Sequence, residues 1–449
     1  MPGKERTRFG RGLLALPRGT LGPVTVADGG ETAPVSVALV GAGQRGIEVY
    51  GDYIFRHPEA ARLVAVAEPD PTRRALTVRL HRLPPDRAFT TWEHLLSRER
   101  LADALIIATP DRVHVEPALR ALALGYHILL EKPIATTRDE VLRLQRAAME
   151  SSGSVTVAHV LRYTEFFATI KRLLDEGRIG RLISIVHIEN IGFWHFAHSY
   201  VRGNWRRAET ASPMILAKAC HDFDLIRWFA DRPCRSVSSC GELTYFRPEN
   251  APPGATERCT DPCPVEPTCL YSAVEIYVRR FAHRTGWPGS VITVDPRPTA
   301  RLQALRESPY GRCVFRCDND VPDHQVVTLE FAGGITATLI VSAFTAENTR
   351  TVKLMGTHGE IRGHLGRGEI VAYPFSSGPP LVLHTQGGEG HAGGDEGLMQ
   401  AFLDRVQRLR TGAEASAAIT SLSDCVDSHL MAFAAEESRR TGRVVHLDR

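Results

Sequence analysis

The sequence predicts an α/β Rossmann domain, built on a doubly wound parallel sheet, followed by an α+β domain with a large, mostly antiparallel, open-faced sheet. Three observations support this fold class. From residue 35, short and almost continuously apolar runs alternate with helical patterns, as in parallel sheets covered on both faces. A glycine-rich turn directly follows the first of these runs. After about residue 158, longer stretches alternate apolar and polar residues, as in strands with one solvated face.

The first predicted domain spans residues 35–157. Its buried strands are expected at 35–40, 63–67, 104–108 and 128–130. A helix at 116–124 stops at Gly125, which suits a helix end, and Thr137 with Glu140 forms a capping box before a helix at 141–149. Residues 1–34 are expected to form a flexible extension, since their apolar stretch at 13–16 is too short for a signal peptide.

The second predicted domain spans residues 158–449. A helix at 166–176 ends at Gly177, and strands follow at 182–188, 325–331 and 336–342. A Cys- and Pro-rich insertion lies at about 247–320. We expect the open sheet face to join copies of the chain into a homo-oligomer.

Composition excludes several classes of protein. The 449 residues carry 54 basic and 51 acidic side chains, for a net charge of +3. This balance argues against nucleic acid or an anionic membrane as a partner. No apolar run approaches the ~18 residues of a membrane span. Nine cysteines without a signal peptide indicate a reducing compartment, so we expect a cytoplasmic protein.

The glycine-rich turn has the pattern of a dinucleotide site. It reads Gly41-Ala42-Gly43-Gln44-Arg45-Gly46 and precedes a helix-compatible run at 47–55. Gly41 permits the tight turn, Gly43 lets the backbone approach a pyrophosphate, and Gly46 lets helix and strand pack closely. The helix N-terminus offers free N–H groups to the phosphates.

Glu68 closes the second strand at the distance expected for the ribose-binding acid. Its carboxylate would accept the ribose hydroxyls and repel a 2′-phosphate, which favours NAD over NADP. Arg73 and Arg74 lie close enough to weaken that preference.

Two further strand ends carry candidate groups, Thr109-Pro110-Asp111 and Glu131-Lys132-Pro133. The carboxyl ends of parallel strands are where the nicotinamide is expected. A lysine held there could exchange the proton that accompanies hydride transfer. Taken alone, a lysine after a strand is more often a surface charge.

These residues resemble the Gfo/Idh/MocA family, named after glucose–fructose oxidoreductase and inositol dehydrogenase. The matching motifs include Gly41-x-Gly43-x-x-Gly46, Ala108-Thr109-Pro110, His114, Glu131-Lys132-Pro133, Arg162-Tyr163 and His221-x-x-Asp224-Leu225-x-x-Trp228. The resemblance implies hydride transfer on polyols, sugars or their derivatives. It also implies that Lys132 and His221 form the catalytic pair, that His114 belongs to the cofactor site, and that Arg162 and Tyr163 belong to the substrate site.

Spacing also places His221, Asp224 and Leu225 on one helical face with Trp228, where Asp224 could orient the imidazole. A histidine in such a pattern is by default a core residue. One departure from the family pattern concerns the position four residues before His221, which usually holds Asp and here holds Ala217. The proton relay is therefore expected to differ, or to run through Asp222, Lys218 or a substrate group.

A substrate surface is predicted where aromatic rings and hydrogen-bonding groups mix, at residues 194–206. Its candidates are Trp194, His195, His198 and Trp205. A metal on the two histidines is disfavoured because a third ligand is lacking nearby. His391 and Asp395 lie in a glycine-rich loop before a helix at 396–409, and Asp395 is either a ligand or the N-cap of that helix.

The insertion contains a cysteine cluster. Cys259, Cys263 and Cys269 lie among prolines, with Cys313 and Cys317 downstream. Four thiolates around a structural zinc ion would order a segment with little apolar content. Cys317 is preferred as the fourth ligand because the turn Asp318-Asn319-Asp320 could aim it. Unligated thiols remain the equal alternative.

Three functions are compatible with this sequence. The first is an NAD-dependent dehydrogenase acting on a sugar, inositol or related polyol. The second is a glycoside-processing enzyme that uses held NAD to oxidise and re-reduce a sugar carbon. The third is a non-catalytic sugar-sensing protein of the same fold, which Lys132 and His221 argue against and Ala217 keeps open.

Overall fold

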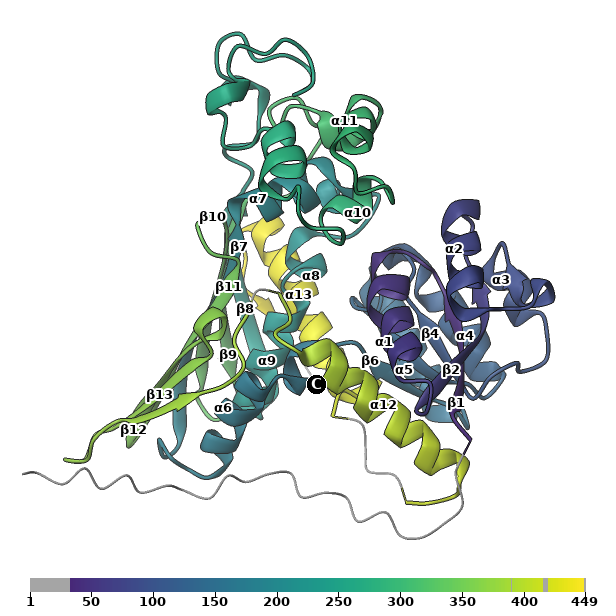
Figure 1. The fold of residues 1–449 in the computed structure, drawn as a ribbon. Coiled ribbons are helices and arrows are strands. Elements are labelled where there is room, and N and C mark those ends of the chain that lie inside the picture. The colour runs from purple at the N-terminus through teal and green to yellow at the C-terminus, as the bar shows by residue number, and fades with distance from the viewer. Residues whose placement is uncertain (1–32, 389, 415–418, 448–449) are drawn as a thin grey trace, which may run out of the picture.

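The computed structural model describes residues 33–388, 390–414 and 419–447. The predicted extension at 1–34 therefore lies almost entirely outside the described residues. The described part folds around two sheets, a parallel sheet formed from its N-terminal part and a longer, mostly antiparallel sheet from the remainder (Figure 1). A search of the described helices finds none with the length and apolar character needed to cross a membrane.

The parallel sheet has six strands in the order β3-β2-β1-β4-β5-β6. The four strands predicted from apolar runs are confirmed as β1, β2, β4 and β5. The sequence analysis missed β3 and β6, which are short. The bounds are β1 Val35–Val40, β2 Ala61–Ala67, β3 Ala88–Phe89, β4 Ala104–Ile107, β5 His127–Leu130 and β6 Ser154–Val157.

Helices cover both faces of this sheet, as expected for a doubly wound fold. The predicted capping box is confirmed, since Thr137 accepts from the Glu140 amide at 3.3 Å. The helix predicted after the glycine turn begins as a π-helix, Gln44–Gly51, and continues as α1. The other helices are α1 Asp52–Arg56, α2 Pro71–His81, α3 Trp92–Leu96, α4 Val115–Ala123 and α5 Arg138–Glu150.

The second sheet has nine strands in the order β14-β13-β12-β11-β7-β10-β9-β8-β15. Its pairs are antiparallel except β10 with β7, which confirms the predicted, mostly antiparallel sheet. The bounds are β7 Leu182–Gly192, β8 Cys234–Glu242, β9 His324–Phe331, β10 Thr336–Thr345, β11 Thr349–Gly356, β12 Gly359–His364, β13 Glu369–Pro374, β14 Leu381–His384 and β15 Val445–His446.

One face of the second sheet is covered by α6, α9 and α13 (Figure 1). Along β9 and β10, buried residues alternate with partly exposed ones, so the opposite face meets solvent. α12 runs between the two sheets and also contacts β1. The bounds are α6 Glu165–Asp175, α7 Phe193–Phe196, α8 Met214–Ala217, α9 Cys220–Ala230, α12 Gly394–Arg410 and α13 Leu422–Thr441.

The Cys- and Pro-rich insertion leaves the sheet where β8 and β9 pair, between residues 242 and 324. Its α-helices are α10 Gly289–Ile292 and α11 Pro298–Glu307, which lie in the upper part of the molecule in Figure 1. The insertion has its own small apolar core, in which Tyr277, Phe281 and Tyr310 pack with Trp194 of α7. It is therefore a packed subdomain attached to one hairpin.

Buried histidines join the two halves of the fold, and His429 of α13 shows how. The Ile134 amide donates to Nε2 of His429 at 2.9 Å, and Nδ1 lies 3.0 Å from the Cys425 carbonyl, to which it donates. These two backbone groups thus favour the neutral form of His429 that carries its proton on Nδ1. Burial, reinforced by the neighbouring His159, lowers the pKa of His429 to about 3.

We expect acid to destabilise the protein through this ring. Below pH ~6.5 the unfolded chain binds a proton at His429 and the folded chain does not, so the free energy of unfolding falls by up to about 1.4 kcal/mol per pH unit. His429→Gln should flatten this dependence in urea unfolding measured between pH 7 and pH 5. His384→Gln, which changes an exposed ring, should not. Identical slopes for both variants would remove His429 as the source.

Candidate active site

The glycine turn after β1 has the backbone geometry that a dinucleotide needs. Gly41 has φ +88°, and a Cβ on Gly46 would lie 2.0 Å from the Gly41 carbonyl oxygen, so both positions require glycine. Gly43 differs, since a Cβ there would meet Arg73 Nη1 at 3.9 Å as its nearest neighbour. The turn is therefore open at the position where the backbone must approach a pyrophosphate.

Glu68 lies beside this turn, as predicted. Its Oε2 accepts from the Ala42 amide at 2.6 Å and its Oε1 accepts from the Asp70 amide at 2.9 Å. Each carboxylate oxygen keeps a second lone pair for a hydroxyl. Arg74 donates to the backbone carbonyl of Glu68 at 2.6 Å. Arg73 is therefore the one of the two arginines that lies beside Gly43 and could weaken the preference for NAD over NADP.

His114 joins the two predicted strand-end loops. Its ring nitrogens lie 2.6 Å from the Pro133 carbonyl and 2.9 Å from the Thr109 carbonyl. The ring is 1% exposed, so it positions the Thr109-Pro110 and Glu131-Lys132-Pro133 turns against each other. The family resemblance assigned His114 to the cofactor site, and the buried ring would support that site by holding the two turns.

Lys132 extends from the end of β5 to the second domain. Its Nζ donates to the backbone carbonyl of Ala217 at 2.9 Å, the position where the family pattern has Asp. Lys132 also lowers the pKa of His221, which follows Ala217 by four residues. Through the bond from Lys132 to Ala217, the two residues of the predicted catalytic pair lie on segments that meet at the junction of the domains.

His221 is 3% exposed, and its Nε2 is a buried polar atom without a hydrogen-bond partner in the described residues. Its Nδ1 lies 3.4 Å from Nδ1 of His159. Burial, with Lys132 and His159 adding to it, lowers the pKa of His221 well below its ordinary value. The ring is therefore neutral near pH 7, and its unpartnered nitrogen is available to a ligand.

Asp224 does not orient His221 as predicted. Both of its oxygens accept from Arg162, at 2.7 Å each, in a buried bidentate pair. Arg162 is thus a partner of Asp224 rather than a free substrate ligand, and Tyr163 binds Thr420 Oγ1 through its hydroxyl at 3.0 Å. Helical spacing placed Asp224 on the same helix face as His221, but it could not identify Arg162 as the partner of the Asp224 carboxylate.

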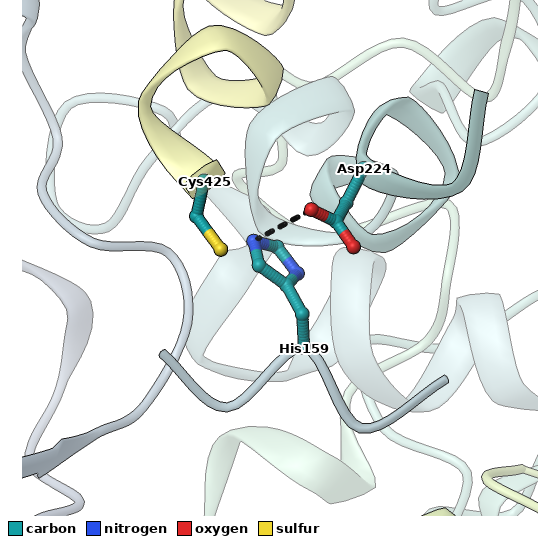
Figure 2. Close-up of side chains that lie close together, drawn as sticks. All are labelled: His159, Asp224 and Cys425. Carbon is teal, nitrogen blue, oxygen red and sulfur yellow. Dashed lines mark ion pairs between the residues drawn. The ribbon is translucent and has the colours of Figure 1, made fainter. Parts of the chain in front are cut away.

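His159, Asp224 and Cys425 bring their ligand atoms within 4.8 Å of one another (Figure 2). His159 Nε2 and Asp224 Oδ1 are 4.0 Å apart. The carboxylate already faces the guanidinium of Arg162, and a metal dication would be repelled by that buried positive charge. We therefore treat this group as part of the histidine core and not as a metal site.

A second buried network joins the glycine turn to α12. Arg45 donates to Glu131 at 2.5 Å and to Asp395 at 2.7 Å, and Tyr50 donates to Glu131 at 2.6 Å. Asp395 also accepts from His391 at 3.0 Å, and the His391 ring lies 5.4 Å from that of His221. The structure thus places the imidazole rings of His391 and His221 next to each other.

Two predicted roles in this network need correction. Arg45 was expected to bind the cofactor, but its guanidinium is engaged by Glu131 and Asp395. Asp395 is not the N-cap of α12, because Gly393 occupies that position. Gln44, which the sequence analysis assigned to cofactor binding, is the first residue of the helix after the turn, and its role in cofactor binding stays a prediction.

The predicted substrate stretch divides into core and junction residues. His198 is 2% exposed, bonds the Tyr277 hydroxyl at 2.7 Å and stacks on Tyr310, and burial lowers its pKa to about 3. Trp194 packs on Phe281 in the insertion core. These two residues are core residues, which corrects their assignment to the substrate surface.

The other two residues of that stretch stay near the junction. Trp205 donates through Nε1 to Asp111 at 3.1 Å, linking the second domain to the end of β4. His195 is partly exposed and contacts Asn348 Oδ1 at 2.8 Å through Nδ1. His195 therefore remains the member of the stretch best placed to meet a substrate.

The alternatives for a substitute carboxylate are bound elsewhere. Asp222 Oδ1 accepts from His187 at 2.8 Å and from Arg350 at 2.7 Å. Lys218 pairs with Glu189 at 3.0 Å. Burial raises the pKa of Asp222, but Arg350 and His187 outweigh it and hold that pKa below the ordinary value. Asp222 is thus the anion of a buried ion-pair network.

Sequence reasoning missed His159, the nearest polar partner of His221. The residue follows β6 directly, so it lies at a strand carboxyl end just as Thr109 and Lys132 do. The rule that selected those two residues would have selected His159 had the short strand β6 been recognised. Arg45 and Asp395 are 350 residues apart in the sequence, so no local sequence pattern could have predicted their contact.

Comparisons with known proteins agree with this geometry. A model described as an oxidoreductase family with an NAD-binding Rossmann fold matches residues 35–159. A second model, the C-terminal alpha/beta domain of an oxidoreductase family, matches residues 171–447.

Relatives are similar over part of the chain. The Bacillus subtilis protein YteT is 27% identical over 336 residues, covering 70% of this chain and 76% of YteT. The inositol 2-dehydrogenase of Leifsonia xyli is 28% identical over 237 residues, 51% of this chain and 62% of that protein. The 2,7-anhydro-N-acetylneuraminate hydratase of Mediterraneibacter gnavus is 28% identical over 207 residues, 46% of this chain and 52% of that protein.

Among solved structures, an inositol dehydrogenase homolog from Azotobacter vinelandii complexed with NADH and myo-inositol aligns with a TM-score of 0.64. The alignment covers 93% of this chain and 98% of that chain at 15% identity. At this identity the likeness demonstrates a shared fold. The nine-stranded sheet and the parallel sheet are thus arranged as in solved oxidoreductases.

Proposed function

This chain belongs to the Gfo/Idh/MocA oxidoreductase family, and on that premise we propose that it transfers a hydride between NAD and a sugar, inositol or related polyol derivative. The observation that carries the proposal is the position of Lys132 after β5, with Nζ on the Ala217 carbonyl, four residues before the buried His221, whose Nε2 has no hydrogen-bond partner among the described residues. The names of the Leifsonia and Azotobacter proteins support inositol-like substrates.

The residues of the glycine turn fit a nicotinamide dinucleotide. Gly43 leaves space for the pyrophosphate, and Glu68 offers carboxylate oxygens to ribose hydroxyls while repelling a 2′-phosphate. When bound, the nicotinamide would accept or supply the hydride. The Thr109-Pro110 turn and the Glu131-Lys132 turn, held together by His114, would line its path.

The proton is handled by the protein's own side chains. Lys132 would hold the reacting oxygen by a hydrogen bond from Nζ and stabilise the negative charge that develops on it. His221 is neutral, so its Nε2 would accept the hydroxyl proton while its Nδ1–H donates to Nδ1 of His159. The Ala217 carbonyl fixes the ammonium of Lys132 where a carboxylate side chain is missing.

One relative supports a second candidate function. The Mediterraneibacter protein is named as a hydratase of an anhydro sugar, and such a reaction has no net oxidation. An enzyme of that kind would oxidise and re-reduce one carbon with the same bound cofactor. Incubation with NAD and a panel of polyols, sugar acids and glycosides separates the candidates. Net NADH formation supports the dehydrogenase, turnover without it supports the second function, and binding without turnover supports a sensor.

We also propose a cytoplasmic homo-oligomer. All nine cysteines are free, which suits a reducing compartment. The open face of the nine-stranded sheet presents apolar residues such as Phe344, which is 44% exposed, and a second copy would cover them. Light scattering should give a mass of at least twice 49.5 kDa, and Phe344→Glu should lower it. A monomeric wild type would contradict the pairing.

Glu68 should set the cofactor preference. By calorimetry, NAD(H) should bind more tightly than NADP(H). Glu68→Gln removes the charge but keeps an acceptor for the Ala42 amide, so it should narrow the difference by about tenfold, or about 1.4 kcal/mol. Preferred or equal NADP(H) binding by the wild type would disprove this role.

Lys132→Ala and His221→Ala should retain NAD affinity and lose turnover by on the order of 100-fold or more, the scale of general acid–base catalysis. Steady-state rates on whichever substrate the panel identifies are the measurement, with cofactor titration alongside. Lys353→Ala and His384→Ala change residues of the second sheet away from the junction and serve as controls. Normal rates in both site variants would exclude the pair from the mechanism.

A further inference from the structure

Four cysteines of the insertion line one small cavity. They are Cys259, Cys263, Cys269 and Cys313. Cys317, preferred from sequence, lies outside this lining and its thiol faces the Cys313 carbonyl at 3.3 Å. The cavity measures about 20 Å³, which is room for roughly one water-sized occupant. Two segments of the insertion, residues 252–272 and 313–315, therefore converge on a space for a single small species.

The cavity also adjoins a buried cation that has no carboxylate partner among the described residues. Arg202 is 1% exposed and donates to the carbonyls of Arg312 and Tyr271 at 2.7 Å and to Cys259 Sγ at 3.6 Å. Its Nη1 has no hydrogen-bond partner there. A buried guanidinium is costly unless an anion neutralises it. The acidic groups closest to hand are the thiols themselves.

We infer that the insertion binds one zinc ion through Cys259, Cys263, Cys269 and Cys313. Four thiolates around Zn²⁺ carry a net charge of −2, which supplies the counter-charge that Arg202 lacks. The ion would also tie together a proline-rich segment that has few apolar side chains of its own. Cys313 takes the place that sequence reasoning gave to Cys317.

Binding requires a small rearrangement and releases protons. Among the described residues, no three of these sulfurs lie within 4.8 Å of one another, whereas a tetrahedral site places each about 2.3 Å from the ion. The side chains must therefore move together when the ion binds. Zinc is held by thiolates, so any of the four cysteines that carries a proton releases it on binding.

The size of the cavity selects among thiolate-bound metals. Four thiolates in tetrahedral geometry suit either zinc or iron–sulfur chemistry. A single zinc ion needs less space than a cluster of several iron and sulfide ions, so the cavity of about 20 Å³ favours the single ion.

The test is elemental analysis of the full chain, purified without a chelator or a metal-affinity resin. We expect about one zinc per chain, a loss of zinc with lowered thermal stability in Cys313→Ser, and full zinc content in the matched control Cys317→Ser. Stoichiometric iron in place of zinc, or the reverse ranking of the two variants, would overturn the assignment.

A second measurement does not depend on how the variants fold. Wild-type protein stripped of metal is titrated with Co²⁺, whose tetrathiolate complexes have intense charge-transfer bands and tetrahedral visible bands. We expect saturation at about one equivalent, reversal by Zn²⁺ and protection of four of the nine thiols from alkylation. Metal-free wild type that shows no such bands and gains no thermal stability from Zn²⁺ would refute the site.

Discussion

The guanidinium of Arg45 is the point on which the junction of the two sheets depends. It binds the Glu131 carboxylate beside Lys132 and the Asp395 carboxylate at the start of α12, while its own backbone belongs to the glycine turn. Glu131 is almost fully buried, whereas Arg45 and Asp395 are about a quarter exposed. Loss of the Arg45 guanidinium would therefore leave the Glu131 carboxylate buried without this cation, which destabilises the junction. The glycine turn, Lys132 and His391 are thus held in fixed relative positions.

The fold and the strand-end residues could be predicted from the sequence because their signals are local. The apolar run of β1, the glycines after it and the position of Glu68 occur within a few tens of residues, and parallel sheets always place strand ends at one edge. β3 escaped recognition because it has only two residues. β6 is as long as β4 and β5, but it alternates Ser and Thr with valine and so lacks their nearly continuous apolar run. His159 was lost with β6.

The predicted substrate stretch failed for a different reason. A run of aromatic and histidine residues records only that these side chains need an apolar or hydrogen-bonded environment, not which segment provides it. For His198 and Trp194 the environment comes from Tyr277 and Phe281, some eighty residues later. Asp224 shows the same limit. Helical spacing predicted which face of the helix carries Asp224, but not that its carboxylate would bind Arg162, because Arg162 belongs to another element.

The attachment of the insertion has an evolutionary consequence. β8 and β9 pair in continuous antiparallel register from Ser236 to Glu242, so the sheet is complete without the residues that connect them. The entropy of closing such a loop grows only with the logarithm of its length, by about 0.6 kcal/mol per doubling. Mutation and selection can thus lengthen, trim or exchange this segment in a lineage while Lys132 and His221 stay unaltered. The insertion is therefore an appendage whose change in length or sequence leaves the pairing of the sheet intact.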